Sequence, residues 1–517
     1  MIKSALTPWD IFIIVGYFMF MIWLGARFKK NQKDTKQYFL GKQNLPGWVV
    51  GMSLFATIIS SWTFIALPGK AFKSDIQYLA NVLILPFCAF IASKYLISLF
   101  RNRIKLSAYE YLEKRFGLFA RIYGNLAFLI VHFGKMAAIL YLLSLTISGI
   151  TGWNIFFLIL TIGVATIFYT FHGGIEGVVW SEVIQGFLLI GGGVLSVLFI
   201  FFTFPGGVSC LFVETIAAGK LKLFSFDFTW NNLNTIVLLF FGLNYWMQKY
   251  VSDQTVVQRY LLARTQSNAC HAIWISSLLI VAIWVLFMSL GAFLWTFYTF
   301  QPGLLPVSLM STPDKVYPYF IGHQLPSGVT GMILSALFAA TMSTLSSDLN
   351  ALGSILYDDY YNKLRKNRDD RRRLKFSRIT VLIAGILCIF LAMAFTNIQS
   401  MADAAFDFVA LVAGGILGMY LLGIFTRRTS PAGLYVGLAL AVTAILYLYF
   451  GNKGTVPPHR FPAVHTLWIG LIGNLITLVA GYLASRIFTP AYSADPLLLA
   501  GFAGTPAADT CNKETLS

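Results

Sequence analysis

Long stretches of apolar residues limit how this chain can fold more than any other feature of its sequence. The chain is 57% hydrophobic and only 11% charged, whereas soluble domains carry about 25% charged residues. A membrane-spanning helix needs about 20 mostly apolar residues, and about thirteen segments reach that length: residues 8–27, 45–68, 77–99, 119–148, 153–171, 176–203, 232–260, 270–298, 330–357, 376–396, 402–426, 430–450 and 466–486. These runs are long and do not alternate with a period of two, which argues against a β-sandwich or β-barrel.

The sequence therefore predicts an all-α polytopic membrane protein with about 13 transmembrane helices. Because the apolar segments follow one another almost without interruption, residues 1–490 are expected to form a single transmembrane domain. The remaining residues, 491–517, are rich in Ala, Pro and Thr, and this composition is typical of a disordered tail.

The distribution of charge predicts how the chain is oriented in the membrane. A net charge of +17 could indicate nucleic-acid binding, but the basic residues collect in alternate loops, including "RFKKNQKDTKQ", "KLRKNRDDRRRLKFSR" and Arg427–Arg428. Loops on that side hold about 26 Lys and Arg residues, against about 8 on the other side. By the positive-inside rule, the N-terminus lies outside and the C-terminus in the cytoplasm, as an odd number of spans requires. We expect a multi-pass protein of the plasma (inner) membrane with no nucleic-acid partner.

Motifs for catalysis or ATP hydrolysis do not stand out in the sequence. The six histidines are scattered without metal-ligand spacing, no Ser-His-Asp arrangement is legible, and no P-loop is present. The five cysteines show neither pairing nor metal spacing. The sequence favours neither an enzyme nor an ATP-driven pump.

Two apolar segments carry polar and helix-breaking residues at bilayer depth. The first, "GMSLFATIISSWTFIALPGKAF", contains mid-membrane hydroxyls and is expected to break at Pro68–Gly69. The second is "FFGLNYWMQKYVSDQTVVQRYLLAR". When the first span is set aside, they begin two consecutive five-helix units, approximately residues 45–203 and 232–426. Interrupted helices at matching positions of two halves are the pointer to an inverted-repeat (5+5) transporter with its site at the membrane midplane.

A serine-rich segment, "SALFAATMSTLSSDLNALGS", presents a polar helical face. Residues Ala340, Ser343, Thr344, Ser347 and Asp348 follow the i, i+3, i+4, i+7, i+8 pattern of one face. Such a face either packs small residues between helices or offers hydroxyl and carbonyl oxygens to a hard cation. We consider cation binding the stronger interpretation because the hydroxyls cluster tightly beside a carboxylate.

Lys135 lies near the centre of "FLIVHFGKMAAILYLLSLTISG", residues 128–149. A lone charge at that depth costs at least about 3 kcal/mol on insertion scales. Lys135 is therefore expected either to bind a ligand or to pair with a buried carboxylate such as Asp348. Lys249 lies four residues before Asp253, a spacing that favours an internal ion pair over a ligand contact.

Five ordered stretches carry a resemblance to a known family. They are "DTKQYFLGKQNLPGWVVGMSLFAT", "AYEYLEKRFG", "GGIEGVVWSEVIQGFLLIGGG", "SDQTVVQRYLLAR" and "FAATMSTLSSDLN". Over residues 8–487 the chain resembles the sodium:solute symporter family, which includes the sodium/glucose cotransporters and has the leucine-transporter fold. Within it, "SAYEYLEKRF" and "GGIEGVVW" are most similar to the bacterial sialic acid transporters.

The resemblance implies three sets of site residues. The principal sodium site would use the carbonyls of Ala56, Ile59 and Ala340 and the side chains of Ser343 and Thr344. A second sodium site would use Glu182, Ser343, Ser346 and Ser347, although the family usually has Asp at the place of Glu182. The solute would contact Ser60, Thr63, Tyr78, Asn81, Val82 and Lys135. The sialic acid branch has Arg at the place of Lys135 and Gln at the place of Val82.

The function implied is sodium-coupled secondary active symport by alternating access. The chain would import a small polar organic solute, expected to be an acidic sugar such as sialic acid, with one or two Na⁺ ions, and would work as a monomer in the lipid bilayer. Two alternatives stay open: a symporter for a neutral sugar or another carboxylate, and a sensor or channel of the same fold that does not transport.

Overall fold

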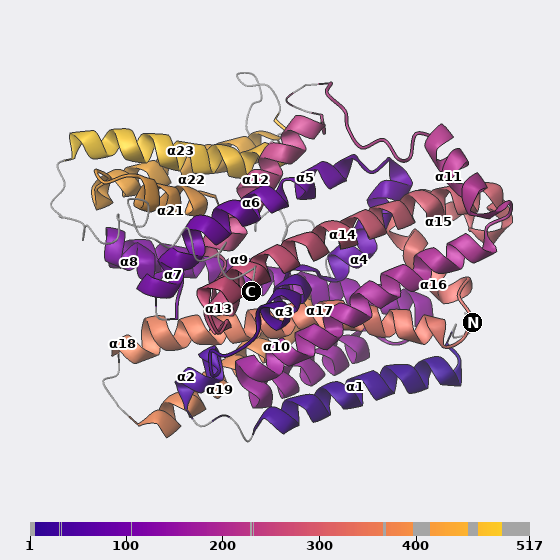
Figure 1. Ribbon diagram of the computed structural model, residues 1–517, viewed down its shortest axis with the longest axis horizontal. Helices are drawn as coiled ribbons and strands as arrows, with labels where there is room; N and C mark the ends of the chain where they lie inside the picture. The colour runs from indigo at the N-terminus through magenta and orange to yellow at the C-terminus, as the bar shows by residue number, and fades with distance from the viewer. Residues whose placement is uncertain are drawn as a thin grey trace, which may run out of the picture.

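The computed structural model is built almost entirely of helices (Figure 1). It describes residues 6–488 except 30–31, 33, 105, 228–229, 231, 365–368, 396–413 and 453–463. Within these residues there is no β-strand, and a single bridge joins Leu45 to Ala263. The predicted all-α fold is confirmed, while the predicted tail, 491–517, falls outside the described residues.

Eight long helices form the body of the protein: α1 (Pro8–Phe28), α9 (Leu118–Thr151), α10 (Ile155–Thr203), α14 (Gln266–Phe300), α17 (Val329–Ile355), α19 (Asp370–Phe395), α22 (Pro431–Asn452) and α23 (Thr466–Ile487). Shorter α-helices connect or extend them: α2 (Thr35–Leu40), α3 (Gly47–Ile58), α4 (Ser61–Lys73), α5 (Ala80–Leu83), α6 (Leu85–Ile91), α7 (Ile97–Arg103), α8 (Glu110–Phe116), α11 (Gly207–Ala217), α12 (Thr235–Ser252), α13 (Gln254–Leu262), α15 (Val307–Met310), α16 (Val316–His323), α18 (Asn362–Leu364) and α21 (Ile416–Phe425). The 3₁₀ and π turns are η2 (Gln77–Leu79), η3 (Ala92–Leu96), η4 (Pro302–Leu304), η5 (Pro313–Lys315) and η6 (Leu356–Tyr361).

The number of spans is not confirmed as thirteen. In the described residues, nine helices are long and apolar enough to cross a membrane, and ten if the bent pair α3–α4 counts as one span. Two predicted spans merge in α10, whose helical geometry is interrupted at Gly174 (φ +55°). A straight helix of that length would measure about 70 Å, more than twice the hydrocarbon core. Residues 402–413 of the predicted span 402–426 fall outside the described residues, and its described part forms the short helix α21.

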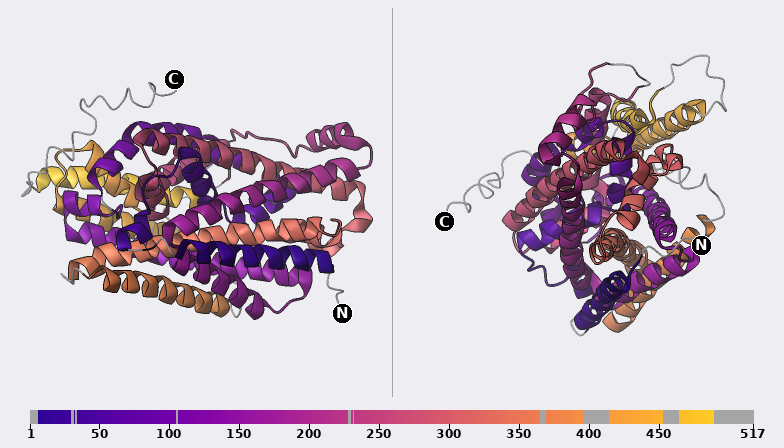
Figure 2. Two further views of the ribbon diagram at one scale, coloured as in Figure 1. Left: turned by 60° about the horizontal axis from the view of Figure 1, so that its bottom comes forward. Right: turned by 90° about the vertical axis from the view of Figure 1, so that its right-hand side faces the viewer.

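The helices run side by side along the long axis of the protein, as Figure 2 shows from the side and from one end. In Figure 1, α8 and α18 lie at one end, and α11, α15 and the N-terminus lie at the other. Among the candidate membrane spans in the described residues, the span that contains α17 has the largest buried share, 89% over 18 residues. Helix α17 packs against α1, α3, α9, α10 and α19, so the serine-rich face lies inside the protein.

The first broken helix consists of α3 and α4, which meet at an angle of 62°. The predicted break at Pro68–Gly69 is wrong, because both residues lie inside α4. The helix opens instead at Ile59 and Ser60, whose backbones are extended. Pro68 packs closely on α14, where a Cβ added at Gly291 would lie 2.2 Å from the Pro68 carbonyl oxygen.

The second broken helix consists of α12 and α13, which meet at the single extended residue Asp253. Its carboxylate caps α13 by accepting a hydrogen bond of 2.9 Å from the backbone N–H of Thr255. The prediction of an interruption in this segment is therefore confirmed. The grouping of the helices into repeats 45–203 and 232–426 stays a prediction.

Candidate functional site

The break between α3 and α4 faces the serine-rich side of α17. Ser343 Oγ donates a hydrogen bond of 2.8 Å to the carbonyl oxygen of Ala56. Thr344 Oγ1 lies 3.4 Å from the carbonyl oxygen of Ile59 and 3.2 Å from that of Ala340. All five residues are buried. The structure thus brings together the three carbonyls and two hydroxyls of the predicted principal sodium site.

These five oxygens suit a hard cation. Hard cations prefer oxygen ligands, and an extended turn at bilayer depth supplies carbonyl oxygens that a continuous helix would use internally. The described residues hold no cluster of three His, Cys, Asp or Glu side chains with metal-binding geometry. An ion at this break would therefore be bound by uncharged carbonyl and hydroxyl oxygens.

The residues of the predicted second sodium site also lie close together, but an arginine is among them. The Glu182 carboxylate accepts hydrogen bonds from Arg259 of α13, one of them 3.1 Å from Nε, and from Ser347. Ser346 Oγ donates to the carbonyl oxygen of Ser343 at 3.0 Å. Arg259 and Glu182 are both fully buried. A guanidinium therefore already neutralises the carboxylate that a second sodium would need.

Sequence reasoning quoted the stretch that contains Arg259 but gave this residue no role. The only indication in the sequence is that Arg259 is a basic residue in "SDQTVVQRYLLAR", a stretch expected to be buried in an interrupted helix. Its partner, Glu182, is 77 positions away in the chain, and only the packing of α13 against α3 and α17 brings the two together.

The predicted solute residues lie in or beside four elements, α4, η2, α5 and α9. Ser60 caps α4 and Thr63 is buried one turn later. Tyr78 of η2 stacks on Trp284 with 5.8 Å between ring centroids. Helix α4 packs against α9, which carries the sixth residue, Lys135.

Asn81 and Val82 lie in α5, and both are buried. The Asn81 backbone carbonyl accepts a hydrogen bond of 3.1 Å from Trp246 Nε1 of α12. Its side-chain Oδ1 is buried and has no hydrogen-bond partner among the described residues. A buried acceptor without a partner is unfavourable, so this oxygen is a suitable contact for a solute hydroxyl or N–H group.

Lys135 belongs to a chain of five ionisable side chains inside the protein. Its Nζ lies 2.8 Å from Asp348 Oδ2, and Asp348 Oδ1 lies 2.8 Å from His132 Nδ1. The other ring nitrogen of His132 lies 3.5 Å from Asp253, which pairs with Lys249. The predicted Lys249–Asp253 pair is confirmed, and the interpretation of Lys135 as a partner of Asp348 is supported by direct contact.

This ionic chain reaches the second broken helix. Asp348 comes from α17, Lys135 and His132 come from α9, and Asp253 is the residue at which α12 gives way to α13. His132 lies three residues before Lys135, a spacing that places both side chains on one face of α9. The Lys135 side chain keeps 24% of its surface exposed, whereas Asp348 keeps none.

Comparison with known proteins decides the family. The model of the sodium:solute symporter family matches residues 38–440. The chain belongs to the sodium:solute symporter family. It is therefore a multi-pass membrane transporter rather than an enzyme, with sodium as its coupling ion.

Two further similarities cover almost the whole symporter. The sodium/sialic acid symporter SiaT of Proteus mirabilis (strain HI4320) is 33% identical over 488 residues, which is 93% of this chain and 95% of that protein. A solved structure of a Na⁺-coupled sialic acid symporter in a substrate-bound outward-open state, described as revealing a novel Na⁺ site, superposes with a TM-score of 0.86. The two sequences are 32% identical, and the superposition covers 95% of this chain and 99% of the chain in that structure.

A more distant structure supports the fold alone. Mhp1, a nucleobase-cation-symport-1 family transporter in a closed conformation, superposes with a TM-score of 0.55 at 15% identity, covering 89% of this chain and 97% of its own. The expected fold of the leucine-transporter type is confirmed by these neighbours.

The buried Glu182–Arg259 pair generates a stability prediction. Removing one partner leaves the other charge buried and unpaired, which costs about 3–5 kcal/mol. We expect Arg259→Gln and Glu182→Gln each to lower the thermal unfolding midpoint of the detergent-solubilised protein, and the double variant to recover much of the loss.

The matched control is Lys114→Gln, which breaks a partly exposed pair with Glu110 and should change stability by less than about 1 kcal/mol. Losses in the double variant that equal the sum of the two single losses would contradict a direct pair between these side chains.

Proposed function

We propose that this symporter imports an acidic sugar, with sialic acid as the expected solute, together with sodium by alternating access. The observation that carries the proposal is the convergence of five neutral oxygens between the α3–α4 break and α17. The similarity to proteins named as sodium/sialic acid symporters supports the choice of solute.

Sodium would bind where Ser343 and Thr344 now donate hydrogen bonds to carbonyl oxygens of the break. When the ion arrives, both hydroxyls turn their hydrogens away and present lone pairs, so that one cation holds the end of α3 and α17 together. No carboxylate contributes, so hydration competes well with the site once water enters. The coupling is the difference in sodium affinity between the outward-open and inward-open states.

We infer one sodium ion per transport cycle, because Arg259 supplies the positive charge beside Glu182 that a second ion would otherwise supply. One sodium gains about 2.3 kcal/mol from a membrane potential of roughly 100 mV and about 1.4 kcal/mol from a roughly tenfold gradient. A solute with one negative charge opposes the potential by the same 2.3 kcal/mol. Uptake of such a solute is then electroneutral and driven by the sodium gradient alone.

Lys135 would recognise the solute by exchanging partners. Its ammonium is paired with Asp348 but partly exposed, so a solute carboxylate can approach it. Asp348 keeps a second contact, to His132 at 2.8 Å, and is not left alone when Lys135 turns to the solute. A lysine binds a carboxylate as a point charge rather than through the two-pronged geometry of arginine, which suits a range of carboxylates.

The same ion pair supports a second candidate. Because Asp348 already neutralises Lys135, a neutral sugar could also be accommodated with Lys135 and Asn81 as hydrogen-bonding groups. A solute with a different carboxylate group is a candidate as well, because any carboxylate could approach the partly exposed Lys135 ammonium. A sensor or channel without transport has no observation in its favour, since the named relatives in the comparison are symporters.

The remaining features of the proposal concern the whole molecule. We propose that the N-terminus lies outside and the C-terminus in the cytoplasm, that residues 1–490 form one domain with repeats 45–203 and 232–426, and that a monomer transports in the lipid bilayer. The position of Arg427–Arg428 between α21 and α22, at the end of the protein that also carries α8, supports the orientation through the positive-inside rule.

The first test is uptake of labelled sialic acid into proteoliposomes with and without an inward sodium gradient. Uptake should require the gradient, show a Hill coefficient near 1 for sodium, and be unaffected by an imposed membrane potential. Ser343→Ala removes one ligand and should raise the half-saturating sodium concentration about 5- to 30-fold, since a hydrogen bond or ligand of this kind contributes on the order of 1–2 kcal/mol.

The matched control is Ser335→Ala on the same helix, whose hydroxyl only donates to the carbonyl oxygen of Gly331. It should leave the sodium dependence unchanged. Sodium-independent uptake, or equal behaviour of the two serine variants, would contradict the proposed site. A Hill coefficient near 2 with uptake stimulated by an inside-negative potential would instead restore the second ion.

The second test concerns Lys135 and Asp348. Asp348→Asn frees Lys135 from its partner and should lower the KM for sialic acid, whereas Lys135→Gln should raise it about tenfold or more, as the loss of a charged hydrogen bond predicts. The double variant Lys135→Gln/Asp348→Asn removes both charges together. It leaves neither partner buried as an unpaired charge and is therefore expected to fold.

Thermal unfolding midpoints measured beside uptake separate folding from recognition. If the double variant folds normally and still transports sialic acid like the unmodified protein, Lys135 is a structural residue and the recognition proposal is wrong. If it keeps glucose uptake but not sialic acid uptake, the carboxylate contact stands.

A further inference from the structure

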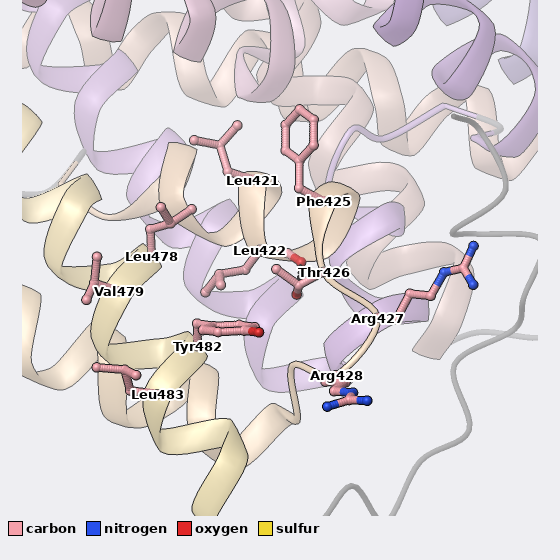
Figure 3. Close-up of a pocket in the computed structure, with 10 residues that line it drawn as sticks. All are labelled: Leu421, Leu422, Phe425, Thr426, Arg427, Arg428, Leu478, Val479, Tyr482 and Leu483. Atoms are coloured by element: carbon pink, nitrogen blue, oxygen red, sulfur yellow. Dashed lines mark hydrogen bonds between the residues drawn. The ribbon is translucent and has the colours of Figure 1, made fainter. Parts of the chain in front are cut away.

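A groove lies between α21 and α23, away from the ion and solute sites. Its volume is about 690 Å³, and ten residues line it: Leu421, Leu422, Phe425, Thr426, Arg427, Arg428, Leu478, Val479, Tyr482 and Leu483. Figure 3 shows apolar side chains from both helices along the groove and the two arginines beside the loop that follows α21. The groove is therefore apolar along its length and basic at one end.

The apolar side chains face outward. Phe425, Val479 and Leu483 are 62%, 54% and 56% exposed, and the helices that carry them are apolar. In a membrane-spanning protein such a surface meets acyl chains rather than water. The occupant of the groove must then have a long apolar part.

The basic end contains a third guanidinium. Arg486 of α23 donates a hydrogen bond of 2.9 Å from one terminal nitrogen to the hydroxyl of Tyr482, which itself lines the groove. Among the residues that the structure describes, no carboxylate lies within ion-pair distance of Arg427, Arg428 or Arg486. Within the described part of the chain, this end of the groove is thus positively charged without a compensating carboxylate.

The loop that bears Arg427 and Arg428 is held in place by neighbouring elements. Buried Arg115 of α8 donates hydrogen bonds to the carbonyl oxygens of Thr426 at 3.0 Å and Thr429 at 3.1 Å. The backbone N–H of Ser430 donates to Ser485 Oγ of α23 at 3.1 Å. Fixed loop ends reduce the entropy that the two arginines lose when they bind a ligand.

We propose that this groove binds an anionic phospholipid of the cytoplasmic leaflet. The phosphate contacts the guanidinium groups of Arg427, Arg428 and Arg486, and an acyl chain lies along Phe425, Val479 and Leu483. Guanidinium groups form strong charge-assisted hydrogen bonds with phosphate, and basic pockets between transmembrane helices on the cytoplasmic side are typical headgroup sites. A free phosphate would leave the apolar groove unfilled, and a zwitterionic lipid would leave the net charge uncompensated.

The test compares lipids added to the protein purified in a neutral detergent. Phosphatidylglycerol should raise the thermal unfolding midpoint by several degrees more than phosphatidylcholine and remain bound in native mass spectrometry. Arg427→Gln/Arg428→Gln should abolish this preference and weaken lipid binding at least about tenfold. Val479→Trp, which fills the apolar part and keeps every charge, should weaken it as well.

The matched control is Arg371→Gln/Arg372→Gln, a pair of arginines in α19 on the same side of the membrane, of which Arg372 is 72% exposed. It should behave like the unmodified protein. If both arginine double variants lose the preference for phosphatidylglycerol equally, the preference comes from general surface charge and the proposal is wrong. So would full competition by inorganic phosphate alone, or lipid binding that Val479→Trp leaves intact, because either result removes the role of the groove.

Discussion

The hydrogen bonds from two hydroxyls of α17 to the open turn between α3 and α4 are the interaction on which the rest of the structure depends. A backbone break inside a membrane is tolerated only where its polar groups find partners. Ser343 and Thr344 supply those partners from a neighbouring helix. These hydrogen bonds offset the cost of the unsatisfied backbone groups at the break. They also bring five neutral oxygens together, so helix packing and the proposed ion site have the same physical origin.

Two systems of buried ion pairs form the second layer of organisation. Arg259 joins Glu182 beside the ion site, while Lys135, Asp348, His132, Asp253 and Lys249 form a continuous chain between α9, α17 and the second broken helix. Both systems connect elements that are remote in sequence. An ion or solute that changes one of these pairs therefore acts on several helices at once, which is the property that alternating access requires.

The sequence predicts the membrane class, the approximate helix positions and the two interrupted helices, because apolar length and polar breaks are local properties. It does not predict where the first helix opens, since Pro68 lies inside α4 and the backbone is extended at Ile59 and Ser60 instead. It also misses the role of Arg259 and the bridging position of His132, because their partners are brought close only by the fold. The principal sodium set was available from the resemblance, and the structure places its five members in contact.

The most direct test of the central claim is the linkage between sodium and solute binding at equilibrium, measured by calorimetry on the detergent-solubilised protein. Sodium should lower the dissociation constant of sialic acid, and saturating sialic acid should lower the apparent dissociation constant of sodium by the same factor. Choline in place of sodium should leave only weak binding. Sialic acid affinity that does not change between sodium and choline would contradict the claim that an ion at the α3–α4 break completes the solute site.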